Sequence, residues 1–228
     1  VITADLTIVE DDGDATQDPD EVLVGGTDSL TTAGAAATIS ASIDTKDVSG
    51  GGGVIVHDII ATSSAEGVTT LTIIDSGGLN SVLNVTGTIT AGAGGDIDDT
   101  LSFDLTTGSM TVTEAVVESA VTNTIDFDIS ANQTLTFLGN VQVDGTIDGA
   151  STGVGTLVLT NGTMTTLTGA IGADESLAAV TIDDNDDATF NSSVSATTIN
   201  STGTGIYKGD VTGAMLLNDN IATFSVAT

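Results

Sequence analysis

An internal repeat near the C-terminus is the feature of this sequence that most limits the possible folds. Three aromatic residues, Phe190, Tyr207 and Phe224, follow one another at equal intervals of 17 positions. Aligning on them superposes the segment TFNSSVSATTI at 189–199 on IYKGDVTGAML at 206–216, so that aromatic, Val and aliphatic positions coincide. A fixed period of this kind indicates supersecondary units stacked on one another. We expect the three aromatic residues to occupy equivalent places in successive units.

Weaker copies extend the repeat toward the N-terminus. The segment TFLGNVQVDGTI carries Phe137 and Val141 in the same order as the C-terminal copies. Thr-x-Thr motifs supply a second set of intervals, because Thr88, Thr111 and Thr134 lie 23 positions apart. Periods in this range match one coil of a β-solenoid, in which two or three short strands are joined by turns that tolerate insertions.

The rest of the chain has the composition of short strands separated by turns. Runs rich in Val, Ile and Thr alternate with clusters of Gly, Asn, Asp and Ser, which favour tight turns. We predict an all-β fold of β-solenoid (β-helix-like) repeats, with β-sandwich domains as the alternative, since sandwiches do not require a repeated phrase. We divide the chain into an N-terminal β-rich region, 1–130, with an acidic loop at 10–21, and a repeat-bearing solenoid region, 131–228. The predicted strands include residues 6–9, 54–56, 69–74, 85–90, 109–113, 134–137 and 156–160.

Charge and composition exclude several classes of function. The chain has 32 acidic residues, two lysines and a net charge of −30. It cannot neutralise phosphates or approach an anionic membrane, so we expect no nucleic-acid partner and no direct membrane insertion. A hydrophobic fraction of 39% still permits a folded chain of thin aliphatic layers. The absence of cysteine removes disulfides and thiolate chemistry.

The beginning of the chain predicts processing. It starts with Val1 and shows no basic-then-apolar leader and no apolar run of membrane-spanning length. We therefore expect a processed protein or a segment of a longer one.

The most regular part of the repeat resembles known surface proteins. The segment GAIGADESLAAVTIDDNDDATFNSSVSATTIN at 169–200, followed by GIYKGDVTGAMLL at 205–217, is similar to repeats in the passenger regions of bacterial autotransporters and other β-strand-repeat cell-surface proteins. These include rickettsial outer-membrane autotransporters and acidic surface-layer proteins. The region 1–130 shares only the composition of such proteins. The resemblance implies a secreted β-helical stalk or surface layer and brings no catalytic residues with it.

Acidic clusters in the predicted loops are candidate calcium ligands. Ca²⁺ takes about six to eight oxygen ligands, and carboxylates that alternate along a Gly-containing loop can supply them. The order of residues does not match an EF-hand. Solvated turns that keep an acidic surface protein soluble, or a surface adapted to high salt, would produce the same pattern. Calcium binding and these two alternatives therefore all stay open. The candidate ligands are Asp11, Asp12, Asp14, Asp18, Asp20, Asp183, Asp184, Asp186 and Asp187, and the theme recurs at Asp96, Asp98 and Asp99.

Catalytic chemistry finds little support, and we predict that the chain is not an enzyme. The single histidine, His57, lies in the strand-like run VIVHDII, where a packed or half-exposed strand residue is expected. Asp126 and Asp128 share one face of a predicted strand, as paired carboxylates of polysaccharide-cleaving enzymes do, but no arginine is present to bind an acidic sugar. Thr-x-Thr motifs at 70/72, 88/90, 111/113, 134/136 and 166/168 raise ice binding by a flat threonine array as a remote alternative.

The ends of the predicted solenoid indicate how the chain would act. A solenoid leaves an open strand edge at each end, which must be capped or paired. Both ends of the sequence read as uncapped strands, so we expect a homo-oligomer or polymer joined head to tail through terminal β-strands. We therefore predict an extracellular, cell-surface structural protein that self-assembles into a bacterial surface layer or fibre, with an adhesin or stalk domain that binds a glycan or protein as the alternative. The expected contact residues are Val1, Ile2, Leu6, Ile8, Phe224 and Val226.

Overall fold

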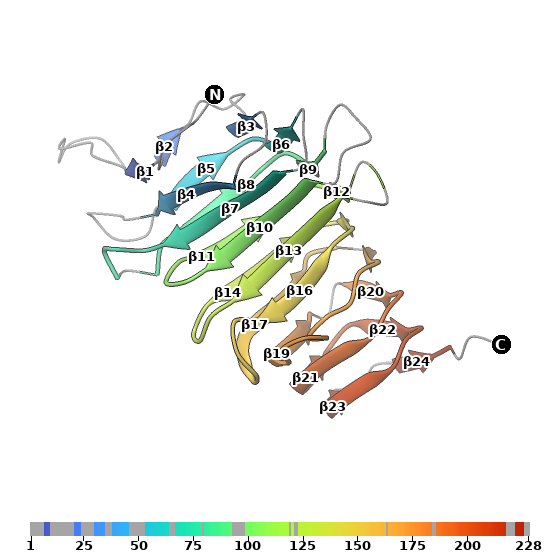
Figure 1. Cartoon of the computed structure of the whole chain (residues 1–228). Helices are drawn as coiled ribbons and strands as arrows, with labels where there is room; N and C mark the ends of the chain where they lie inside the picture. Colours follow the sequence, from blue (N-terminus) through green and yellow to red (C-terminus); the bar gives the residue numbers. More distant parts are fainter. Residues whose placement is uncertain are drawn as a thin grey trace.

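Short strands joined by turns wind the chain into a parallel β-solenoid (Figure 1). The computed structural model describes residues 7–9, 21–23, 30–34, 38–45, 53–63, 67–78, 80–92, 99–118, 120, 123–162, 164–183, 186–217 and 222–225. Within these segments the chain forms three sheets and no helix. The pairings between their strands are parallel, which confirms the predicted solenoid and excludes the antiparallel β-sandwich.

The three sheets are built from successive strands along the chain. The first sheet contains β1 (Thr7–Val9), β4 (Thr38–Asp44), β7 (Gly67–Ile74), β10 (Asp99–Leu105), β13 (Thr124–Ile129) and β16 (Thr146–Gly149). The second contains β2 (Glu21–Leu23), β5 (Gly53–Val56), β8 (Val82–Val85), β11 (Ser109–Val112), β14 (Thr134–Leu138), β17 (Val154–Thr160), β19 (Leu177–Ile182), β21 (Val194–Ser201) and β23 (Val211–Leu217). The third contains β3 (Leu30–Gly34), β6 (Ile59–Ser63), β9 (Ile89–Ala91), β12 (Val116–Glu118), β15 (Gln142–Val143), β18 (Thr165–Leu167), β20 (Asp187–Phe190), β22 (Thr204–Tyr207) and β24 (Ala222–Phe224).

The coils become shorter toward the C-terminus. Each coil up to β18 gives one strand to every sheet, whereas later coils contribute only to the second and third sheets, because the first ends at β16. Leu71 pairs with Phe103, 32 positions later, while Tyr207 pairs with Phe224, 17 positions later. Losing one strand and its turn therefore explains why the short aromatic repeat is confined to the end of the chain.

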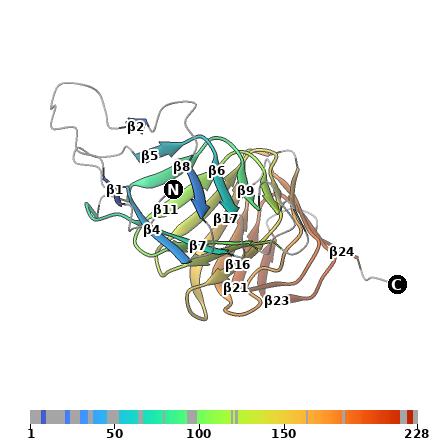
Figure 2. The ribbon, with the colours of Figure 1, turned by 45° about the horizontal axis from the view of Figure 1, so that its top comes forward.

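The three sheets surround an interior (Figure 2). Aliphatic and a few aromatic side chains fill it. Alternation along each strand directs every second residue inward, as in β17, where Leu157 and Leu159 are buried and Val158 is partly exposed. Parallel pairing in register stacks the inward residues into columns that run along the solenoid. One column of the third sheet contains Ile59, Ile89, Val116, Val143, Leu167, Phe190, Tyr207 and Phe224.

The predicted equivalence of the three aromatic residues is confirmed. Phe190 pairs with Tyr207, and Tyr207 pairs with Phe224. Their rings are stacked, with centroids 4.9 Å and 5.5 Å apart. The aromatic spacing in the sequence thus marks one core column.

Two parts of the predicted alignment are wrong. Phe137 pairs with Val112 and Leu159 in the second sheet, so it belongs to a different column from Phe190. All three sheets have the same alternation, and a short phrase does not reveal which sheet it enters. Farther along, a bulge in the pairing of β21 with β23 shifts the register, so that Ile199 pairs with Met215 instead of the next residue.

Candidate functional site: a carboxylate row on the first sheet

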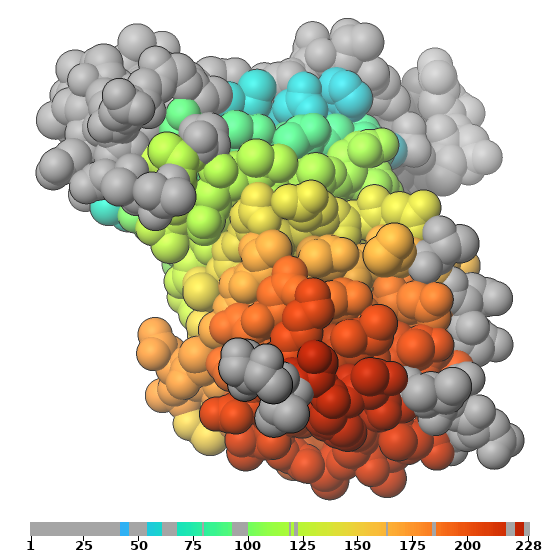
Figure 3. All heavy atoms as spheres, turned by 90° about the vertical axis from the view of Figure 1, so that its right-hand side faces the viewer, coloured from blue at the N-terminus to red at the C-terminus, as the bar shows by residue number. Residues whose placement is uncertain are grey.

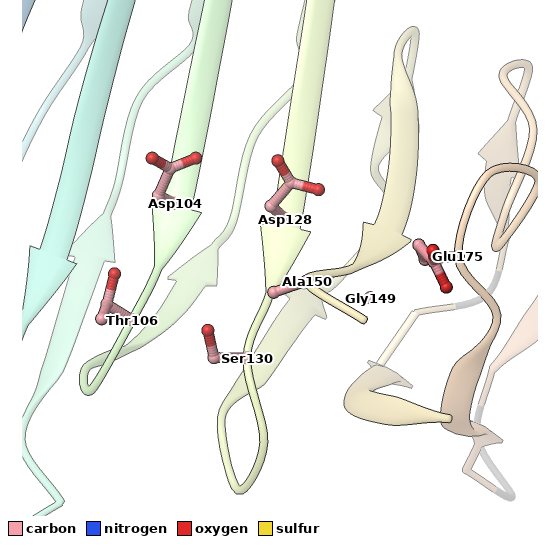
Figure 4. Close-up of a pocket in the computed structure, with 7 residues that line it drawn as sticks. All are labelled: Asp104, Thr106, Asp128, Ser130, Gly149, Ala150 and Glu175. Atoms are coloured by element: carbon pink, nitrogen blue, oxygen red, sulfur yellow. The ribbon is translucent and has the colours of Figure 1, made fainter. Parts of the chain in front are cut away.

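Three aspartates form a row across the outer face of the first sheet. Asp104 of β10 pairs with Asp128 of β13, and Asp128 pairs with Asp148 of β16. Their inward neighbours, such as Phe103 and Phe127, are fully buried, so the alternation of the strands directs the aspartates to the other face. Figure 4 shows the carboxylates of Asp104 and Asp128 side by side on adjacent strands. Neighbouring strands lie about 4.8 Å apart, which brings like charges close together.

A fourth acid flanks this row. Asp126 lies two residues before Asp128 on the same face of β13, as the sequence alternation predicted. The hydroxyl of Thr146 on the next coil donates a hydrogen bond to Asp126 Oδ1 at 2.6 Å. Asp126 is therefore tied to its neighbouring strand, while Asp128 faces carboxylates on both sides.

Burial and repulsion raise the pKa values of the row. For Asp128, burial is the largest cause, followed by repulsion from Asp126, Asp104, Asp148 and Asp174, and its pKa rises to about 6. Burial also raises the pKa values of Asp104 and Asp148. At Asp148, main-chain hydrogen bonds from the turn that includes Asp174 oppose this rise. The row therefore holds protons more tightly than isolated carboxylates do.

A cavity of about 360 Å³ opens beside the row (Figure 4). Acidic, hydroxyl and small residues line it, and none of these lining residues is cationic. Such a cavity suits a cation or a proton better than an anionic substrate. The lining residues are Asp104, Thr106, Asp128, Ser130, Gly149, Ala150 and Glu175.

We predict that Asp128→Asn stabilises the protein at neutral pH. Since the folded-state pKa of Asp128 is raised from 3.8 to about 6, the wild type loses stability as pH rises from about 4 to about 6, because over this interval the unfolded chain has released a proton that the folded state still holds. After allowance for solvent screening, the gain at pH 7.5 is of the order of 1 kcal/mol and is absent at pH 4. Urea unfolding at the two pH values measures it.

An exposed acid away from the row provides the control. Asp210→Asn removes one charge from an exposed turn before β23. It should change stability little at either pH. A gain at pH 7.5 equal to that of Asp128→Asn would attribute the effect to net charge instead of to the row.

Other acids close the corners between coils. The N–H of Thr88 donates to Asp58 Oδ1 at 2.7 Å, and Thr88 lies 30 positions later in the chain. Asp44 accepts the N–H and the hydroxyl of Ser76 at 3.0 and 2.6 Å. Carboxylates thus satisfy polar groups of the next coil that would otherwise lack partners. Part of the acidity is therefore structural.

The predicted calcium ligands divide into two groups. Asp183 and Asp186 lie between β19 and β20, and Asp187 is the first residue of β20. The side chain of Asp186 is only 1% exposed, accepts a hydrogen bond from the Thr165 hydroxyl at 3.2 Å, and has a pKa that burial raises. Within the described segments, no three Asp, Glu or His side chains converge closely enough to hold a metal ion. Asp11, Asp12, Asp14, Asp18, Asp20, Asp96, Asp98 and Asp184 lie outside the described residues, as does the side chain of Asp99.

His57 lies at a corner and not within a strand. The run VIVHDII is divided between β5 and β6, with His57 and Asp58 forming the turn between them. The His57 side chain is 42% exposed, and its Nε2 lies 4.0 Å from Asp58 Oδ2. The exposed position explains how a polar ring is accommodated next to two apolar strands.

The Thr-x-Thr motifs do not form a single array. The motif at 70/72 lies on the first sheet, those that include Thr111 and Thr134 on the second, and the motif at 166/168 at β18 of the third. Thr111 pairs with Thr136, 25 positions later, so the equal spacing of the Thr-x-Thr motifs does not mark equivalent positions.

The sequence pattern identified Asp126 and Asp128 as a pair but did not identify Asp104 and Asp148, the other two members of the row. The interval from Asp104 to Asp128 is 24 positions and that from Asp128 to Asp148 is 20, so no fixed period links them. The available signal was local: each of the three aspartates directly follows a large buried residue, Phe103, Phe127 or Ile147.

Comparison with known proteins does not suggest a role, so the role must be inferred from the geometry of the solenoid. No protein-family model, no curated protein and no solved structure matches the chain. Over the described residues, no helix is present that could cross a membrane. The exposed apolar side chains of β23 and β24 and the different charges of the three sheets therefore bear on the role of the chain.

Proposed function

We propose that the chain is a non-enzymatic structural subunit outside a bacterial cell that assembles end to end into a surface layer or fibre. The observation that carries this proposal is the exposure of apolar side chains on β23 and β24, the last strands of the second and third sheets that the structure describes. Leu217 continues the column of Ser201, and Phe224 continues that of Tyr207. Ser201 and Tyr207 are 1% exposed, whereas Leu217 and Phe224 are 44% and 58% exposed. Covering these apolar side chains with another coil is favourable.

The outermost described strands of the second and third sheets support the same contact. In the order of described strands, β23 and β24 end the second and third sheets, and β2 and β3 begin them. An edge strand presents main-chain donors and acceptors to any strand that aligns with it. Figure 3 shows atoms of the C-terminal coil, in red, on the surface that faces the viewer.

A head-to-tail contact continues two of the three sheets. It places β23 beside β2 of the next copy and β24 beside β3, with all strands parallel. Since the contact joins two different surfaces, it propagates as a filament. Phe224 belongs to this contact, but Ile8 in β1 meets no partner strand, because the first sheet ends at β16. Val1, Ile2, Leu6 and Val226 lie outside the described residues.

Charge sets the conditions for assembly. Two chains of net charge −30 repel each other, but β23 and β24 contain no charged residue. We propose that Ca²⁺ or environmental salt lowers the remaining repulsion. The resemblance of residues 169–200 to repeats of surface proteins supports an extracellular, cell-surface location.

Blocking the end should abolish assembly. In Leu217→Asp/Phe224→Asp, two buried charges would face the next coil, so we expect single rods at protein concentrations where the wild type forms filaments. Negative-stain microscopy and analytical ultracentrifugation measure this. As the matched control, Ala131→Asp places a charge on an exposed turn in mid-solenoid and should leave the filaments intact.

Microscopy of the wild type, with calcium and with a chelator, distinguishes an assembling subunit from an adhesin or stalk. Filaments or sheets that persist with calcium and shorten with a chelator support an assembling subunit that uses calcium. Isolated rods at every salt and calcium concentration would contradict self-assembly and favour the adhesin or stalk.

A further inference from the structure

The second sheet differs in charge most strongly from the first sheet, while the strands of the third sheet include two acids, Glu118 and Asp187. Its eight strands from β5 to β23 contain no Asp, Glu, Lys, Arg or His. The strands of the first sheet include six aspartates, among them the carboxylate row. A chain with 32 acidic residues thus keeps one broad face free of charge.

Small and β-branched side chains form straight columns on this face. One column runs through consecutive coils in register and consists of Asn84, Thr111, Thr136, Val158, Thr181 and Asn200. A neighbouring column contains Thr134, Thr156, Ala179 and Thr198. All of these residues are partly exposed. The side chains are short and similar in length, so the face is even enough for another sheet to pack against it.

We propose that this face is the lateral contact between two copies of the chain. Two sheets can pack face to face about 10 Å apart, with inner side chains that interdigitate. Copies that approach through this face keep their carboxylate rows apart, whereas contact through the first sheet would bring the rows together.

The size of the face suits a weak contact that is repeated many times. Eight strands about 4.8 Å apart, each presenting about 15 Å of its length, cover roughly 500 Å² per copy, or about 1,000 Å² in total. This is near the lower limit for a specific interface. Filaments that present many such faces would bind one another through combined contacts. The inference rests on the proposed function, since the lateral contact would join end-to-end filaments into a layer.

A pair of matched variants tests the lateral contact. Thr136→Asp introduces a charge into the centre of the face, and Thr166→Asp introduces the same charge on β18 of the third sheet. In the end-blocked background, Leu217→Asp/Phe224→Asp, ultracentrifugation should detect side-by-side dimers at protein concentrations above those at which this variant forms single rods. We expect Thr136→Asp to raise the dissociation constant of these dimers at least tenfold. Thr166→Asp should leave it within twofold of the value for the end-blocked protein.

Cysteine cross-linking supplies a second readout, because the chain has no cysteine of its own. In the end-blocked protein, Thr136→Cys should yield covalent dimers with a short bis-maleimide linker, and Thr166→Cys should not. Equal yields at both positions would contradict the inference.

The outcomes separate the two proposals. Wild-type filaments that never associate sideways, together with an unlinked Thr136→Cys variant, would overturn the lateral contact and leave end-to-end assembly intact. Side-by-side dimers without filaments would overturn end-to-end assembly and leave the lateral contact intact. A monomeric wild type with thermal hysteresis that Thr136→Asp abolishes would identify ice as the occupant and overturn the lateral contact.

Discussion

Replacing Phe127 with alanine is expected to lower the free energy of unfolding by about 3–5 kcal/mol. The Phe127 side chain is fully buried, stacks on Phe103 with ring centroids 4.9 Å apart, and meets Phe137 edge-on at 6.2 Å. Its removal leaves a cavity that touches adjacent coils. The strands around it are held in register by main-chain ladders, so they can close the cavity only in part. Urea unfolding followed by far-ultraviolet circular dichroism measures the loss.

The same substitution at an exposed position is the control. Phe224 is 58% exposed on the last coil, and Phe224→Ala should cost about 1 kcal/mol or less at concentrations too low for assembly. Equal losses for the two variants would show that the aromatic interior is not the main source of stability. A smaller loss at Phe127 than at Phe224 would contradict the proposed core.

The sequence predicted the solenoid because its last coils have a constant length. From β20 to β24, each coil has two strands and two corners, so Phe190, Tyr207 and Phe224 recur at a constant interval in one column. Earlier coils include a strand of the first sheet and turns of different length. Their periods vary, and the repeat is lost from the sequence although the fold continues.

Corners were harder to locate than strands. Residues 85–90 were predicted as one strand, but they contain the end of β8, a corner and the start of β9. At this corner the N–H of Gly87 donates to the carbonyl of His57 on the previous coil at 2.5 Å. A Cβ atom at Gly87 would also lie 2.5 Å from that oxygen, so glycine is required by a contact 30 positions distant. Local sequence contains no sign of that contact.

The carboxylate row shows the same limit for the candidate site. Alternation along β13 was sufficient to place Asp126 and Asp128 on one face. Recognising Asp104 and Asp148 as their neighbours requires the register between strands, which depends on turn lengths. The raised pKa of Asp128 follows from that register, so it could not be read from the sequence.

Gly155→Ala is expected to destabilise the protein by about 2–3 kcal/mol, because it combines two separate penalties. Gly155 lies in β17 with φ +75°, a conformation that L side chains rarely adopt. An added Cβ would also lie 2.6 Å from both the Cβ and the carbonyl oxygen of Ile129 on the preceding coil. Relief of this clash requires β13 and β17 to separate, which weakens packing next to the carboxylate row. Thermal and urea unfolding of the variant measure the loss.

Gly78→Ala isolates the backbone penalty from the clash. Gly78 has a similar φ of +68°, and an added Cβ would meet nothing within 4 Å. Its substitution should therefore cost only the left-handed conformation, about 1 kcal/mol. The difference between the two variants then measures how rigidly adjacent coils hold their spacing. If Gly155→Ala cost no more than Gly78→Ala, the coils would be able to move apart freely, and an ordered row of carboxylates on strands at fixed spacing could not persist.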